Sequence, residues 1–114
     1  MTTVYDVLVK AREVITKPEH WIKGMTCANE ALIPVDITRE AAYCFCSIGA
    51  IDRALYLLDG TFRLNDVLLD SAFDALAKSV KVDSIALWND DSCRTHEEVL
   101  AAFDDAIAQT KETK

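Results

Sequence analysis

Residues 88–98, WNDDSCRTHEE, hold the densest set of chemically active side chains in the chain. Two interpretations of Trp88, Asn89 and Asp90 remain open. Asn and Asp side chains form turns by bonding to nearby backbone, and Trp88 would then be a hydrophobic plug at a corner. Alternatively, an indole, an amide and a carboxylate beside a helix N-terminus line a pocket with both donors and acceptors. We favour the structural interpretation of this stretch.

Cys93 and His96 are the residues from which an enzyme would be built. Cys93 lies in a predicted loop beside Arg94, where a thiol is more reactive than in an apolar helix. His96 begins a predicted helix, whose positive end favours the neutral imidazole that can act as a base. Together with Asp90 they would form the site of a small enzyme.

The other cysteines suggest no further chemistry. Cys44 and Cys46 fall inside a predicted helix, where residues two apart point about 200° away from one another. They would be inert thiols that neither bond each other nor share a metal ion, and Cys27 lies outside any zinc spacing. We therefore expect no metal site and no cofactor.

Four helices are expected to position these residues. Apolar residues recur with helical spacing over residues 3–16, 39–58, 66–80 and 96–109. Each predicted helix has a suitable N-cap residue. These are Thr2 or Thr3, Thr38, Asn65 and Thr95, and Thr95 forms a capping box with Glu98. Gly60 suits the end of the second helix, and residues 84–88 add a single turn. The predicted fold is an all-α bundle of four main helices in one domain, residues 1–114.

The helix predicted over residues 39–58 is apolar nearly all round, so we expect it to be central. Gly49 inside it costs about 1 kcal/mol relative to alanine, which calls for a close neighbour or room for a ligand. We favour the close neighbour. Residues 18–37 contain both prolines and are predicted to be irregular, with a short extended piece at 31–35. An irregular segment of this length is often functional.

The composition and charge of the chain narrow the classes of partner that it can bind. The 114 residues are 51% hydrophobic and carry a net charge of −7. An acidic chain with scattered cations repels phosphate backbones, so no nucleic acid is expected. The longest apolar runs are too short to span a membrane, and the N-terminus lacks the form of a signal peptide. These features predict a cytoplasmic protein without a membrane partner.

Three short pieces of sequence form a further pattern. They are Trp21-x-x-Gly24, Cys46-x-x-Gly49-Ala50-Ile51, and Trp88-Asn89-Asp90 followed after four residues by Thr95-x-Glu97-Glu98-Val99. With these pieces in this order, the chain resembles a small, uncharacterised helical domain family of bacteria and their phages. The resemblance implies a compact helical domain with no established activity.

These observations favour a non-catalytic interaction or ligand-binding module whose partner is a host or other protein, including a second copy of itself. The alternatives are a protein that binds or sequesters a small molecule such as a nucleotide, and the small enzyme described above. We expect Trp21 and Trp88 to pack near Gly49, with side-chain-to-backbone bonds from Asn89 and Asp90 shaping the turn. His20 is a further candidate at the rim of this site. The candidate binding residues are Trp21, Lys23, Arg53, Trp88, Asn89, Asp90 and His96.

Overall fold

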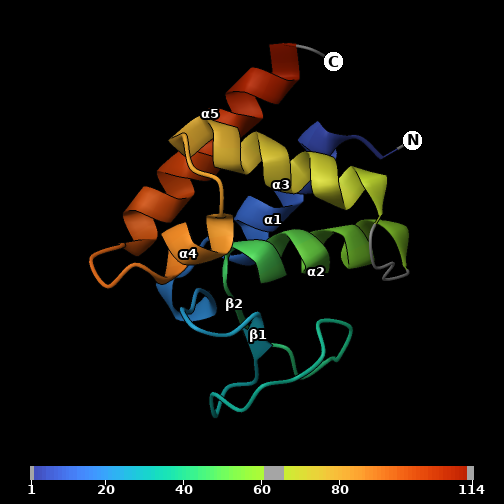
Figure 1. Ribbon diagram of the computed structural model, residues 1–114. Coiled ribbons are helices and arrows are strands. Elements are labelled where there is room, and N and C mark those ends of the chain that lie inside the picture. The colour runs from blue at the N-terminus through green and yellow to red at the C-terminus, as the bar shows by residue number, and fades with distance from the viewer. Residues whose placement is uncertain (1, 61–65, 113–114) are drawn as a thin grey trace.

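The computed structural model describes residues 2–60 and 66–112, which form one mainly helical body with a very small sheet (Figure 1). This confirms the predicted fold class. In chain order the elements are α1 (Val4–Val14), a 3-10 turn (Pro18–His20), β1 (Cys27–Ala28), β2 (Cys44–Phe45), α2 (Ser47–Asp59), α3 (Val67–Val80), α4 (Ile85–Asp90) and α5 (His96–Glu112). None of the helices described is long and apolar enough to cross a membrane.

Two helices share the centre of the body. α1 packs against α2, α3 and α5, while α2 also contacts α3 and α4. The buried face of α1 and the buried face of α2 are both fully excluded from solvent, and they meet in one core with α3 and α5. The buried residues at this centre include Val7, Leu8, Ala11, Ile51, Ala54 and Leu55.

The second helix begins eight residues later than predicted. Residues 39–46 are not its first two turns, because β2 pairs antiparallel with β1, with Cys27 opposite Phe45 and Ala28 opposite Cys44. Backbone pairing with a distant segment thus overrides a run of residues that is compatible with a helix. The N-cap of α2 is Cys46, whose Sγ accepts from the Gly49 amide at 3.4 Å. The predicted cap Thr38 instead bonds to Asp36.

Most other helix ends follow the local sequence. Thr3 caps α1 in a capping box with Asp6. Thr95 and Glu98 form the predicted box at the start of α5: the Glu98 amide donates to Thr95 Oγ1 and the Thr95 amide to Glu98 Oε1. The cap of α3 is Asp66, whereas the predicted cap, Asn65, lies outside the described residues. Gly60 ends α2 with φ of +79°.

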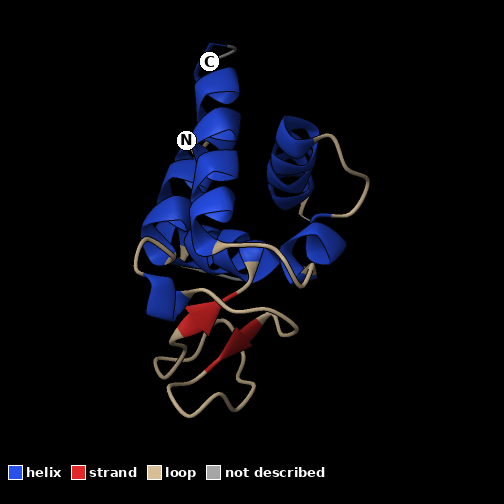
Figure 2. Cartoon of the chain, turned by 90° about the vertical axis from the view of Figure 1, so that its left-hand side faces the viewer, coloured by secondary structure: helices blue, strands red, loops and turns tan. Residues whose placement is uncertain are grey.

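Residues 21–46 leave the helical body and return to it, and we call this segment the excursion. Figure 2 shows its two strands and their loops beyond the ends of the helices. The piece expected to pair at residues 31–35 does so locally, since Pro34 forms a bridge with Ala28 and the Asn29 amide donates to the Ile33 carbonyl. Backbone hydrogen bonds therefore join parts of the excursion even though it holds little regular structure.

Candidate functional site

Asn89, at the end of α4, is a fully buried side chain that joins three distant parts of the chain. Its Oδ1 accepts from the indole of Trp21 at 2.7 Å and from both the amide and hydroxyl of Ser47, at 3.0 and 2.6 Å. Its Nδ2 donates to the carbonyl of Ile22 at 3.1 Å and to Asp90 Oδ1 at 3.0 Å. The same Asp90 oxygen accepts from the Gly24 amide at 2.9 Å. We call this cluster the Asn89 junction.

The junction unites the three sequence pieces singled out above. Trp21 and Gly24 belong to the first, Ser47 lies within the second, and Asn89 and Asp90 belong to the third. Ser47 is the first residue of α2, so its amide has no partner within the helix. Asn89 supplies that partner from another helix. The predicted side-chain-to-backbone bonds of Asn89 and Asp90 are thus present, but they reach across the molecule rather than within their own turn.

The presence of glycine at position 49 is explained by a close structural neighbour, as the sequence favoured. That neighbour is the backbone of Thr26 and not an indole. A methyl group at Gly49 would overlap the carbonyl oxygen of Thr26 and lie 2.9 Å from its carbonyl carbon. That carbonyl also accepts from the Cys46 amide at 3.2 Å as the excursion returns. The backbone next to β1 therefore passes directly over the start of α2, where only a residue without a side chain fits.

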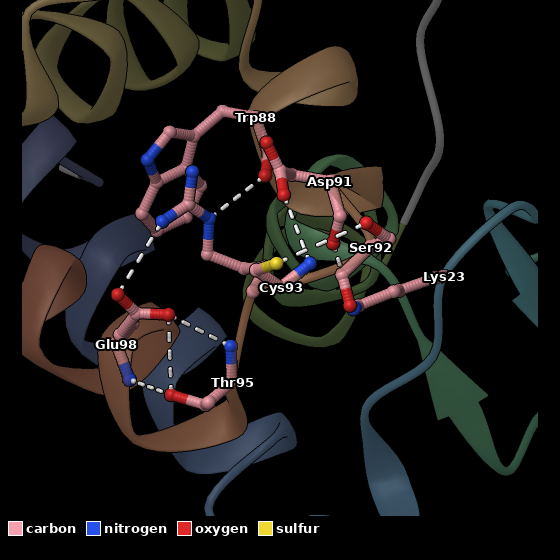
Figure 3. A network of polar contacts seen from close by, with 8 residues as sticks. Lys23, Trp88, Asp91, Ser92, Cys93, Thr95 and Glu98 are labelled. Atoms are coloured by element: carbon pink, nitrogen blue, oxygen red, sulfur yellow. Dashed lines mark hydrogen bonds and ion pairs between the residues drawn. The ribbon is translucent and has the colours of Figure 1, made fainter.

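Trp88 is a half-buried residue of α4, close to the turn that leads to α5 (Figure 3), and the three atoms nearest to a methyl group at Gly49 belong to Thr26 and not to an indole. The Arg94 guanidinium carbon lies 4.1 Å from a Trp88 ring centroid, and Arg94 Nε donates to the Trp88 carbonyl at 2.9 Å. Arg94 also pairs with Glu98 at 3.5 Å. Lys23 reaches the same corner from the excursion and donates to the Asp91 carbonyl at 2.7 Å. The corner is a cation–π contact supported by hydrogen bonds.

His96 is occupied by a structural contact. Its Nε2 lies 2.6 Å from the carbonyl oxygen of Ile15, the residue that follows α1. A carbonyl only accepts, so Nε2 carries the proton and donates to it. The ring of Trp21 lies beside the same imidazole, tilted by 40° and with the centroids 6.0 Å apart. His96 thereby ties the start of α5 to the end of α1.

The cysteines differ sharply in accessibility. Cys93 is exposed, and its amide donates to Asp91 Oδ1 at 2.9 Å. Cys27, Cys44 and Cys46 are buried, and burial raises the pKa of the Cys27 thiol to about 11 and the pKa values of the Cys44 and Cys46 thiols above their usual value. The inert state predicted for Cys44 and Cys46 agrees with this direction, although Cys44 lies in a strand and Cys46 caps a helix.

Six of the seven predicted binding residues lie in the junction or next to it, and one lies elsewhere. Arg53 is the exception, because it donates to the carbonyls of Ile37 and Arg39 at 2.7 and 3.0 Å and holds the returning half of the excursion. His20 is also engaged apart from the others, with Nδ1 2.5 Å from the Tyr43 carbonyl. The residues that gather are Trp21, Lys23, Trp88, Asn89, Asp90 and His96.

The candidate residues of the small enzyme, Cys93, His96 and Asp90, each make separate contacts. Within residues 2–60 and 66–112, no hydrogen bond joins Cys93 to His96 or to Asp90. The same ranges contain no group of three His, Cys, Asp or Glu residues arranged to hold a metal ion. The polar groups of Asn89, Asp90 and His96 are used to join segments of the fold.

The tip of the excursion was not among the predicted site residues. Leu32 and Ile33 are 59% and 57% exposed, and Leu32 has φ of +65°, in the left-handed region that disfavours side chains. Asn29 holds this turn, because its Oδ1 accepts from the amides of Ala31 and Ile33 at 2.9 and 3.0 Å. We call Leu32 and Ile33 the apolar tip. The sequence signal for it is Asn29 followed, after Glu30, by the apolar residues 31–33 inside an irregular segment.

Comparisons with known proteins bear on the whole chain. Neither the curated proteins nor the solved structures that were searched contain a match. Residues 1–109 match the family of unknown function DUF6197. This span includes the Asn89 junction, the apolar tip and nearly all of α5, so the chain belongs to this uncharacterised family.

Proposed function

We propose that this protein is a non-catalytic interaction module, of bacterial or phage origin, that binds a partner protein through the apolar tip. One observation carries the proposal: two large apolar side chains stand in solvent on a turn whose backbone is held in place by Asn29. Binding residues are disproportionately found on surface loops, and exposed apolar groups can mark sites of protein contact.

The conformation of Leu32 supports a binding role for the turn. A side chain in the left-handed region costs about 1–2 kcal/mol, and such residues persist where the surrounding structure enforces them. Fully burying a Leu or Ile side chain contributes about 1.5–3 kcal/mol. A turn that is already ordered loses little further conformational entropy when a partner covers it.

The proposal is tested by photo-crosslinking from the tip. A photoreactive residue at Leu32 is compared with one at Leu87, which is 76% exposed but lies on α4. We expect one defined protein adduct in bacterial extract from position 32 and none from position 87. Equal labelling from both positions would contradict the proposal.

The captured partner then gives a quantitative test. Leu32→Asp is expected to weaken its binding by about 30-fold, as for a hot-spot residue worth about 2 kcal/mol. The matched change Leu87→Asp is expected to leave the affinity within about twofold. Circular dichroism of both variants checks that the fold is retained.

A second copy of this chain is one form that the partner can take. Light scattering over a dilution series separates the cases: a dimer that Leu32→Asp dissociates identifies self-association through the tip. The enzyme alternative is tested by alkylation of Cys93 at pH 7. Reactivity no greater than that of a free model thiol would remove the only exposed cysteine as its nucleophile.

A further inference from the structure

A groove of about 620 Å³ lies at the opposite side of the helical body from the excursion, between α1, α3 and α5. The first turn of α1 contributes Val4 and Tyr5, α3 contributes Ala75 and Lys78, and α5 contributes Gln109. This volume is within the range of about 300–1,000 Å³ that is usual for small-molecule sites. None of these residues belongs to the Asn89 junction or to the apolar tip.

The groove results from small side chains on one face of α3. Ser71, Ala75 and Lys78 are four and three residues apart and therefore share a face. Near the end of α3, Ser79 Oγ lies 3.3 Å from the carbonyl of Ala102 on α5, which joins the two helices there. Toward the start of α3, Ser71 and Ala75 leave space that larger residues would fill.

The rim of the groove carries one charge of each sign. Asp74 and Lys78 are one helical turn apart on α3, and this spacing commonly gives an ion pair. Among residues 2–60 and 66–112, neither side chain forms a hydrogen bond or an ion pair. An acidic and a basic group therefore border the same mainly apolar hollow without neutralising one another.

We propose that this groove binds a small zwitterion with an apolar side chain, of the class of a free amino acid or dipeptide. Asp74 matches its ammonium group, Lys78 matches its carboxylate, and Val4 and Ala75 offer apolar surface to its side chain. A ligand with only one charge would leave the opposite rim group unmatched. This inference is independent of the proposed protein-binding function.

The test uses L-leucine as the probe and amide chemical shifts of the full chain as the readout. We expect shifts confined to the lining residues of α1, α3 and α5. N-acetylleucine lacks the ammonium group and leucinamide lacks the carboxylate, and each is expected to bind about tenfold more weakly. No shifts with leucine, or equal binding of all three compounds, would overturn the proposal.

Variants of α3 make the test specific. Ala75→Leu fills the hollow and is expected to abolish the shifts, and Lys78→Gln is expected to weaken leucine binding about tenfold while leaving the groove open. Asp70→Asn removes an exposed charge of α3 that does not line the groove, and is expected to bind as the wild type does. Thermal unfolding checks that each variant is folded. Binding unchanged by Lys78→Gln would contradict the assigned chemistry.

Discussion

The Asn89 junction and the apolar tip reverse the usual placement of polar and apolar residues. The junction contains an amide and a hydroxyl that are fully buried and bonded to one another. The tip holds two large aliphatic side chains that are more than half exposed. The junction holds the base of the excursion, where it leaves the helical body. The tip is exposed at the far end of the same segment.

If the tip is the binding surface, chemically versatile residues such as Asn89 serve the fold and not the site. The buried amide of Asn89 stabilises the fold because it satisfies polar groups that are removed from water. Without it, those groups would lose their solvation and gain no hydrogen bond in return. The aliphatic residues of the tip contribute little to the fold and remain available for contact. If the tip is the binding surface, the junction is its scaffold, and substitutions at Asn89, Gly49 and Leu32 test this division.

Asn89→Ala is expected to have the largest effect. It leaves the Ser47 amide and hydroxyl, the Trp21 indole and the Ile22 carbonyl without their partner. Several unsatisfied buried groups should lower the free energy of unfolding by about 4 kcal/mol. Urea denaturation measures this, with the exposed Ser92→Ala as control. A loss below about 1 kcal/mol would mean that the junction is not the scaffold.

Gly49→Ala is expected to have the second largest effect on stability. The added methyl group meets the backbone of Thr26 rather than a movable side chain, so strand or helix must shift. We expect a loss of about 3 kcal/mol in the free energy of unfolding. Gly60→Ala is the contrasting control, because its φ of +79° is unfavourable for alanine although nothing lies within 4 Å of the added methyl group, and about 1 kcal/mol is expected. Equal losses would remove the close approach as the reason for Gly49.

Asp52→Asn should change stability in the opposite direction. Burial raises the pKa of the Asp52 carboxyl to about 6, above its ordinary 3.8, so the folded state disfavours the carboxylate. As far as Asp52 decides it, the wild type should therefore be most stable below about pH 4, and its free energy of unfolding should fall as the pH rises from there through about 6. Asparagine removes this cost and should add about 1–2 kcal/mol at pH 8, but little at pH 4. Unfolding at both pH values measures the difference, and an equal gain at both would refute the assignment.

Leu32→Gly should have the smallest effect on stability. Glycine relieves the left-handed backbone at the tip but adds freedom to the unfolded chain, so the two contributions nearly cancel. We expect a change within about 0.5 kcal/mol. A large loss on thermal unfolding would show that the tip supports the fold, which would end the contrast with the junction.

Local signals in the sequence predicted the parts of the fold that local interactions determine. The capping box of Thr95 and Glu98 involves neighbours only, and it appears as expected. The strand at Cys44–Phe45 was mistaken for helix because its partner, β1, lies 16 or more residues away. Gly49 signalled a close neighbour, but spacing alone did not identify Thr26. Side-chain bonds of Asn89 are expected from its turn chemistry, but no local signal indicates their distant partners Trp21, Ile22 and Ser47.

The long reach of the Asn89 bonds has a consequence for the order of folding. They join residues 42 to 68 positions apart, so the chain must close large loops before any of them can form. Contacts of this kind are expected to appear after the transition state, when the helices have already assembled. Removing them should then speed unfolding and leave the folding rate nearly unchanged. The excursion would be the last part of the molecule to settle and the first to open.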